Sequence, residues 1–186
     1  PHGGVIKAQR LDGNTLCMST GQGLAAVDVK TGAPKWVLPL DNSGGFYPPS
    51  IPGDGYIYKH AGTNAGTVRV VDAGTGKELC KADTGKWVYD MTAGAGAVYL
   101  HHGDNVLHAL DAETGQEKWA YTAVARFEHG LFVADGRVYA KSWKAVVCLR
   151  PEDGTEVWTF PTTKMSWMTG FAARGDTLYC GVDGSL

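Results

Sequence analysis

A repeat of about 40 residues constrains this chain more than any other feature of its sequence. Each copy joins an alternating strand, a turn with Asp and Gly, and a strand that carries a large aromatic residue. In Ala109–Trp119, Asp111 can accept hydrogen bonds from backbone N–H groups two and three residues on, and Gly115 supplies the positive φ that ends such a turn with a bulge. Trp119 follows four residues after the glycine, where its face can be buried outside its own hairpin.

Two markers keep this period along the whole chain. The aromatic position recurs at intervals of roughly 40 residues and is occupied by Trp36, Cys80, Trp119 and Trp158. A marker one strand earlier recurs at the same interval through Cys17, Tyr58, Tyr99, Tyr139 and Tyr179. A period of about 40 residues with strands only predicts an all-β protein, a β-propeller whose repeats each form a four-stranded antiparallel blade.

The repeated residues also carry a family resemblance. The pattern Ala-x-Asp-x-x-Thr-Gly-x-x-x-Trp resembles the tryptophan-docking motif of the pyrroloquinoline-quinone (PQQ)-like propeller repeats. It fits in full at Ala26–Trp36 and Ala109–Trp119, and with substitutions at Val70–Cys80 and Cys148–Trp158. The resemblance covers essentially the whole chain and is specific for the fold, whereas many members of the superfamily bind no quinone. It implies the structural docking residues Asp28, Gly32, Trp36, Asp72, Gly76, Asp111, Gly115, Trp119, Gly154 and Trp158.

The repeats predict one partial propeller. Its blades are expected at residues 5–40, 46–84, 87–123 and 127–162, with an incomplete blade at 167–186. Closed propellers have about four to eight blades, so this count favours part of a larger propeller of about seven or eight blades. Completion by a second copy or another chain, and closure of four blades alone, stay open. Trp36, Trp119 and Trp158 are expected to be buried against a neighbouring blade, with a less well filled seam at Cys80.

Composition limits the function classes. A net charge of −2 argues against a nucleic-acid surface. No apolar run approaches the roughly 20 residues of a membrane span, and no signal peptide opens the chain, although Pro1 leaves room for a removed leader or anchor. The cysteines contain no Cys-x-x-Cys pair and are interpreted as buried thiols that act as small hydrophobic residues, with the redox compartment left open: Cys17, Cys80, Cys148 and Cys180.

The histidines and carboxylates do not predict a reaction centre. His101 and His102 are neighbours on a strand, so their side chains point to opposite faces and cannot readily share one ion. His60 and His101 each lie two residues after equivalent tyrosines and are interpreted as polar residues at strand ends. The acidic candidates for a calcium site fall in turns, where Asp is expected anyway. We therefore assign no catalytic, cofactor-binding or metal residue.

A third periodic series is the best candidate for a binding surface. Phe46, Trp87, Phe127 and Trp167 recur with the same period as the other two markers, each at the start of an inner strand and after a linker between blades. These aromatic residues either fill the seams between blades or line a surface. We expect their bodies to fill the seams while Lys86, Arg126 and the linker Asp41–Gly45 supply contacts. The candidate ligand or partner face is Phe46, Tyr47, Lys86, Trp87, Tyr89, Arg126, Phe127, His129 and Trp167.

The resemblance implies a non-catalytic binding or scaffolding module that is bacterial and extracytoplasmic. The resemblance implies that such a module belongs to one of two kinds of protein: the sensor region of a serine/threonine kinase, or an outer-membrane assembly lipoprotein. The expected partner is a protein or the remainder of its own propeller, a second copy included. The alternative is a fragment of a PQQ-dependent quinoprotein dehydrogenase. Such enzymes hold the quinone between a tryptophan and a disulfide of two adjacent cysteines beside a calcium ion, and this sequence contains no adjacent cysteine pair.

Overall fold

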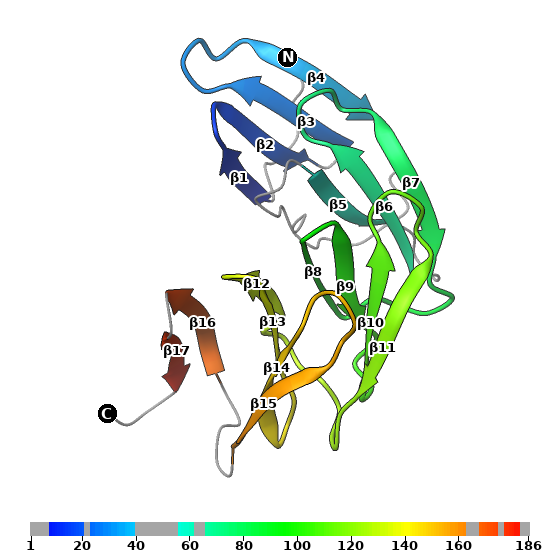
Figure 1. The fold of residues 1–186 in the computed structure, drawn as a ribbon. Helices are drawn as coiled ribbons and strands as arrows, with labels where there is room; N and C mark the ends of the chain where they lie inside the picture. Colours follow the sequence, from blue (N-terminus) through cyan, green and yellow to red (C-terminus); the bar gives the residue numbers. More distant parts are fainter. Residues whose placement is uncertain are drawn as a thin grey trace. The chain divides into compact units, whose positions relative to one another are not determined.

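The computed structural model describes residues 8–20, 23–39, 56–61, 66–162, 168–174 and 177–182, and within these ranges the chain forms strands, turns and no helix (Figure 1). The chain divides into two compact units. The first comprises Pro1–Trp87 with Ala112–Gly115, and the second comprises Val88–Asp111 with Gln116–Leu186.

The first unit contains two antiparallel sheets. One has four strands in sequence order: β1 (Ala8–Asp12), β2 (Thr15–Thr20), β3 (Gly23–Asp28) and β4 (Pro34–Pro39). The other has three described strands: β5 (Tyr56–Ala61), β6 (Thr67–Asp72) and β7 (Glu78–Asp83). Residues 40–55, which precede β5, lie outside the described ranges.

The second unit contains two further four-stranded sheets and a hairpin. The first sheet is β8 (Asp90–Gly94), β9 (Ala97–His101), β10 (Val106–Asp111) and β11 (Glu117–Thr122). The next is β12 (Phe132–Ala134), β13 (Arg137–Lys141), β14 (Ala145–Leu149) and β15 (Glu156–Pro161). The hairpin is β16 (Met168–Arg174) and β17 (Thr177–Val182). The inner strand β12 lies beside β8 and β16, so inner strands of successive sheets meet.

Burial follows strand position within each sheet. Every residue of the middle strands β9 and β14 is buried, whereas every residue of the outer strand β15 is exposed. Continuous apolar runs such as Ala145–Leu149 are typical of strands that are covered on both faces. The core of the second unit is built on these strands, and Tyr99, Leu107 and Phe127 are among its largest fully buried side chains. The predicted fold class, an all-β propeller with four-stranded antiparallel blades, is confirmed.

The turn chemistry predicted from the repeat is present at Asp28. Its Oδ1 accepts hydrogen bonds from Lys30 N at 3.0 Å, Thr31 N at 2.9 Å and Thr31 Oγ1 at 3.0 Å. These bonds, chiefly that from the Thr31 backbone, lower the pKa of the Asp28 carboxyl. A register shift marks a bulge in each of the four repeat hairpins, and the repeat glycines Gly32, Gly76, Gly115 and Gly154 have φ values of 69°, 73°, 72° and 71°.

Two tryptophans dock onto the turn of the following repeat. Trp36 Nε1 donates to Ala73 O at 2.8 Å, and Trp119 Nε1 donates to Pro151 O at 2.9 Å. A Cβ placed on Gly76 would lie 2.6 Å from Trp36 Cδ2, so the indole is seated directly on the glycine. Trp36 is half-buried, and the exposed fraction of Trp119 is 9%.

The prediction that Trp158 is buried was wrong, because 37% of this residue is exposed. The reason is its place in the repeat. Trp36 is covered by Gly76 and Trp119 by Gly154, in each case the turn glycine of the following repeat. Among the described residues, no turn glycine of a following repeat covers the Trp158 indole in this way. At Cys80 the thiol and Ala82 take the place of an indole against Gly115.

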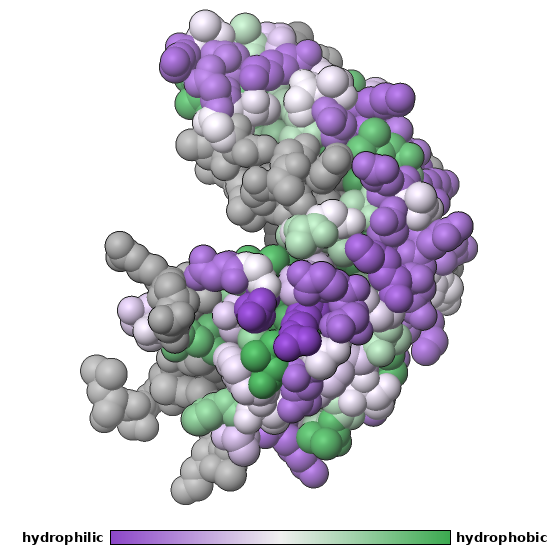
Figure 2. All heavy atoms as spheres, in the orientation of Figure 1, coloured by the Kyte–Doolittle hydropathy of each residue, from purple (hydrophilic) through white to green (hydrophobic). Residues whose placement is uncertain are grey.

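Hydrophilic side chains cover most of the described surface on the face shown in Figure 2, where hydrophobic side chains form small separate groups. The described residues include eight exposed large hydrophobic side chains: Val29, Val37, Val124, Trp143, Val157, Trp158, Phe160 and Tyr179. No helix that is long and apolar enough to cross a bilayer is found in the described part of the chain.

Candidate functional site

The segment 123–131 links β11 to β12, and we call it the connector. It carries three residues of the predicted face: Arg126, Phe127 and His129. Phe127 N donates to Asp104 O at 2.6 Å, and Phe127 forms an isolated bridge with Ser142. The Phe127 side chain is 1% exposed, with its ring centroid 5.5 Å from that of His101. Phe127 therefore fills the core, and only its neighbours in the connector reach solvent.

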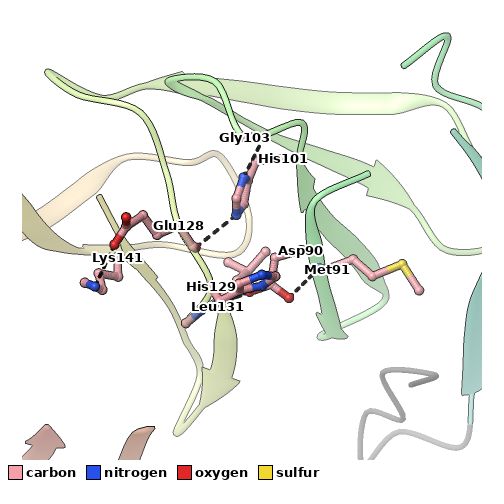
Figure 3. A network of polar contacts seen from close by, with 9 residues as sticks. Asp90, Met91, His101, Gly103, Glu128, His129, Leu131 and Lys141 are labelled. Carbon is pink, nitrogen blue, oxygen red and sulfur yellow. Dashed lines mark hydrogen bonds and ion pairs between the residues drawn. The ribbon is translucent and has the colours of Figure 1, made fainter. Parts of the chain in front are cut away.

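His101 fastens the connector to the end of β9 (Figure 3). Gly103 N donates to its Nδ1 at 3.1 Å, so this nitrogen carries no proton. The other nitrogen, Nε2, lies 3.1 Å from Glu128 O and must donate, because a carbonyl oxygen only accepts. His101 is fully buried, and this burial lowers its pKa from 6.5 to about 4. The imidazole is thus a neutral bridge between two backbone groups.

Asp90 is the second attachment point, at the start of β8. Its Oδ2 accepts hydrogen bonds from Gly130 N at 2.9 Å and Leu131 N at 3.2 Å, and its Oδ1 accepts from Met91 N at 2.9 Å. Burial raises the pKa of the carboxyl, and these backbone bonds oppose that rise because they favour the ionised form. The carboxylate therefore holds the end of the connector beside β8.

The remaining polar groups of this network are also paired. His129 stacks on Tyr89 with ring centroids 4.4 Å apart, and its Nδ1 lies 4.0 Å from Asp90 Oδ2. Glu128 Oε2 forms an ion pair at 2.7 Å with Lys141 Nζ, on a lysine that is almost fully buried. Figure 3 shows Glu128 beside Lys141 and His129 beside Asp90.

This arrangement has the chemistry of a structural clasp. The histidine and the buried carboxylate are each engaged by backbone groups, so neither is poised to take a proton from a bound molecule. Among the described residues, no group of three or more His, Cys, Asp or Glu side chains is arranged to hold a metal ion. His101 and His102 face different surroundings, as predicted, because His102 instead packs near His108.

The predicted face is only partly described. In the first unit Lys86 is exposed and Trp87 is half-buried. In the second unit Tyr89 is half-buried, and Arg126 and His129 are exposed. Phe46, Tyr47, Trp167 and the linker Asp41–Gly45 lie outside the described residues. The second unit thus brings together Tyr89, Phe127 and His129 around one clasp.

Sequence reasoning missed three exposed residues beside Arg126. Val124 precedes it in the connector and is 82% exposed. Trp143 and the exposed Lys144 form the turn between β13 and β14, and 56% of Trp143 is exposed. The Arg126 guanidinium carbon lies 4.3 Å from the centroid of the Trp143 ring, a cation–π contact. The sequence did contain a signal, because Trp143 belongs to none of the three periodic series.

The fold and the docking geometry define a PQQ-type β-propeller. The chain belongs to the family described as outer membrane protein assembly factor BamB, whose family model matches residues 64–166, more than half of the sequence. The BamB structure from Moraxella catarrhalis is 25% identical, with a TM-score of 0.61. The match covers 84% of this chain and 53% of that one, so this chain spans about half of that structure.

Two further relatives are similar over part of their length. The serine/threonine-protein kinase AfsK of Streptomyces griseus is 30% identical over 142 residues, and the match covers 66% of this chain and 16% of the kinase. The chain therefore spans only a small part of that relative. A europium-containing methanol dehydrogenase is 13% identical with a TM-score of 0.59, covering 89% of this chain and 43% of the enzyme. At that identity the similarity shows the fold alone.

Proposed function

We propose that this chain is a non-catalytic, protein-binding propeller module. The proposal rests on the contrast between the buried and the exposed side chains of the connector. Its buried polar groups are engaged by backbone and neighbouring side chains, while its exposed tip presents Val124 and Arg126 beside Trp143. A reaction centre needs buried groups that are available to substrate, whereas a binding surface needs exposed aromatic and arginine side chains on a rigid support.

The proposal includes the setting in which the module works. We place it in a bacterium and outside the cytoplasm, since the family is described by outer-membrane assembly. In that setting its partner is another envelope protein. The similarity to AfsK supports a second home, as the sensor region of a serine/threonine kinase. In both settings we propose that the propeller binds a partner and does not catalyse a reaction.

We also propose that the chain is part of a larger propeller. Trp158 is the supporting observation, because its indole has the repeat position of Trp119 without an equivalent covering turn among the described residues. A further repeat, from the same protein or from another copy, would supply the glycine and the carbonyl oxygen that receive Trp119 in its own seam. The predicted blade limits belong to this proposal.

The rival function is a piece of a PQQ-dependent dehydrogenase, which the resemblance of the repeats leaves open; the similarity to methanol dehydrogenase is one of fold alone. A direct assay separates the two classes. Pyrroloquinoline quinone and calcium are added to the intact protein, followed by measurement of its melting temperature and of dye-linked alcohol oxidation. We expect no change in either, and saturable quinone binding with turnover would establish the enzyme instead.

Binding itself is tested by photo-crosslinking in cells that make the intact protein. A photoreactive amino acid replaces Val124 in one variant and Glu152 in a matched variant. Both positions are exposed, but Glu152 lies in the β14–β15 turn, at the opposite end of its sheet from Trp143. We expect discrete protein adducts from position 124 and not from 152. Absence of adducts at 124, or the same adducts at both positions, would contradict the proposed function.

A further inference from the structure

The exposed end of the connector and the β13–β14 turn beside it form a surface whose charged side chains are all positive. Its composition is typical of protein-recognition surfaces. We define it by four residues: Val124, Arg126, Trp143 and Lys144. Val124 and Trp143 are two of the most exposed large hydrophobic side chains among the described residues. Tryptophan and arginine dominate the binding energy at protein interfaces, because each combines a large contact area with specific polar geometry.

The support beneath this surface is rigid. Ser142 N donates to Ala145 O at 2.8 Å, which closes the turn that carries Trp143. Trp143 N donates to Arg126 O at 3.1 Å, which ties the turn to the connector, and Thr162 N donates to Lys144 O at 2.8 Å. Side chains on a backbone fixed in this way lose less conformational entropy when a partner binds.

The two cations of this surface are available for a partner. Arg126 and Lys144 are both exposed, and no described carboxylate forms an ion pair with either one. The acidic side chain of the connector, Glu128, is already paired with Lys141. The guanidinium lies over the indole ring, so a carboxylate that binds its N–H groups would lie close to the Trp143 side chain.

We infer that this surface binds an acidic segment of a partner protein in which a carboxylate is adjacent to a large apolar side chain. The inference rests on the proposed binding function and specifies its partner. Arg126 and Lys144 neutralise the acidic groups, and Trp143 and Val124 cover the apolar side chain. Two cations on a chain with a net charge of −2 do not form the extended basic stripe that nucleic acids require.

The experiment uses synthetic peptides in which acidity and aromatic content vary independently, with glutamine in place of glutamate in the neutral set. Binding to the intact protein is measured by fluorescence anisotropy. We expect the acidic, aromatic peptides to bind most tightly and to weaken as salt rises. The double variant Arg126→Glu with Lys144→Glu should weaken them by about tenfold or more, since each tenfold step is about 1.4 kcal/mol. Trp143→Ala should weaken them without changing the net charge.

Matched variants separate this surface from general effects. Lys118→Glu with Arg150→Glu makes the same change in net charge at two other exposed residues of the second unit. Trp158→Ala removes a partly exposed tryptophan elsewhere. Neither should change affinity. Equal binding of acidic and neutral peptides, or equal losses in the matched variants, would overturn the inference.

Two further outcomes are distinguishable. Binding to anionic phosphatidylglycerol vesicles without binding to acidic peptides would assign the surface to a membrane and overturn the inference. Discrete adducts from position 124, with no preference for acidic peptides, would leave the proposed protein-binding function standing and remove only the acidic partner. If position 124 gives no adducts and the protein shows no preference for acidic peptides, both proposals are contradicted.

Discussion

The contact between Gly154 and Trp119 gives a quantitative test of how the repeats hold together. A Cβ added at Gly154 would lie 2.6 Å from Trp119 Cε3 and 2.7 Å from Cδ2. Carbon atoms pack at about 3.5–4.0 Å, so the Gly154→Ala variant must move the ring by roughly 1 Å. The ring cannot simply withdraw, because its Nε1 donates to Pro151 O in the same turn.

Gly136 provides the matched control for backbone strain. Its φ of 66° is close to the 71° of Gly154, but nothing lies within 4 Å of a Cβ placed there. Gly136→Ala should therefore cost only the left-handed strain of an alanine, about 1–2 kcal/mol. Gly154→Ala should cost this plus about 1–3 kcal/mol of overpacking. The difference between the two variants isolates the contact with the indole.

Urea unfolding of the intact protein, followed by tryptophan fluorescence and circular dichroism, gives the two free energies of unfolding. In a Trp119→Ala background the Gly154→Ala change should cost no more than Gly136→Ala, because the atoms it would strike are absent. Equal costs for Gly154→Ala and Gly136→Ala in the wild-type background would refute the docking argument.

Three further predictions concern single sites. Trp119→Ala should cost about 3–5 kcal/mol of unfolding free energy, and Trp158→Ala much less, because only Trp119 is buried; equal losses in urea unfolding would contradict this. Nitrogen NMR should show neutral His101 with its proton on Nε2. Because the folded pKa is about 4 and the ordinary value is 6.5, His101 should lower stability as pH falls from 6.5 toward 4, and His101→Gln should lack that component. Glu128→Gln should destabilise more than Lys141→Met, since it leaves a buried ammonium unpaired, as thermal unfolding of both variants would show.

The sequence predicts the features that depend on residues close together along the chain. The bulge, the positive φ of Gly115 and the hydrogen-bonded turn at Asp28 follow from local turn chemistry, which recurs wherever the residues recur. The docking of Trp119 was also predictable, because a regular period places the same surface of the next repeat against it. The fold class therefore follows from two periodic markers.

The site could be predicted only in part, since its contacts join residues that are distant in sequence. His101 meets Glu128 O across 27 positions, and Asp90 meets Gly130 N across 40. No local pattern shows that a strand-end histidine will fasten a connector. The exposure of Trp158 could not be predicted from its own repeat, because the surface that covers a docking tryptophan belongs to a different repeat. Trp143 was detectable only as an exception to the repeat.

The connector end of the second unit is the surface that we propose binds a protein partner. The most direct measurement is amide hydrogen exchange of the intact protein, alone and with the partner captured from position 124. We predict slower exchange at residues 124–126 and 143–144 in the complex, and unchanged exchange in the turns at 135–136 and 150–155, at the other end of the same sheet. Protection confined to those opposite turns, or no change at the connector, would contradict partner binding at this surface.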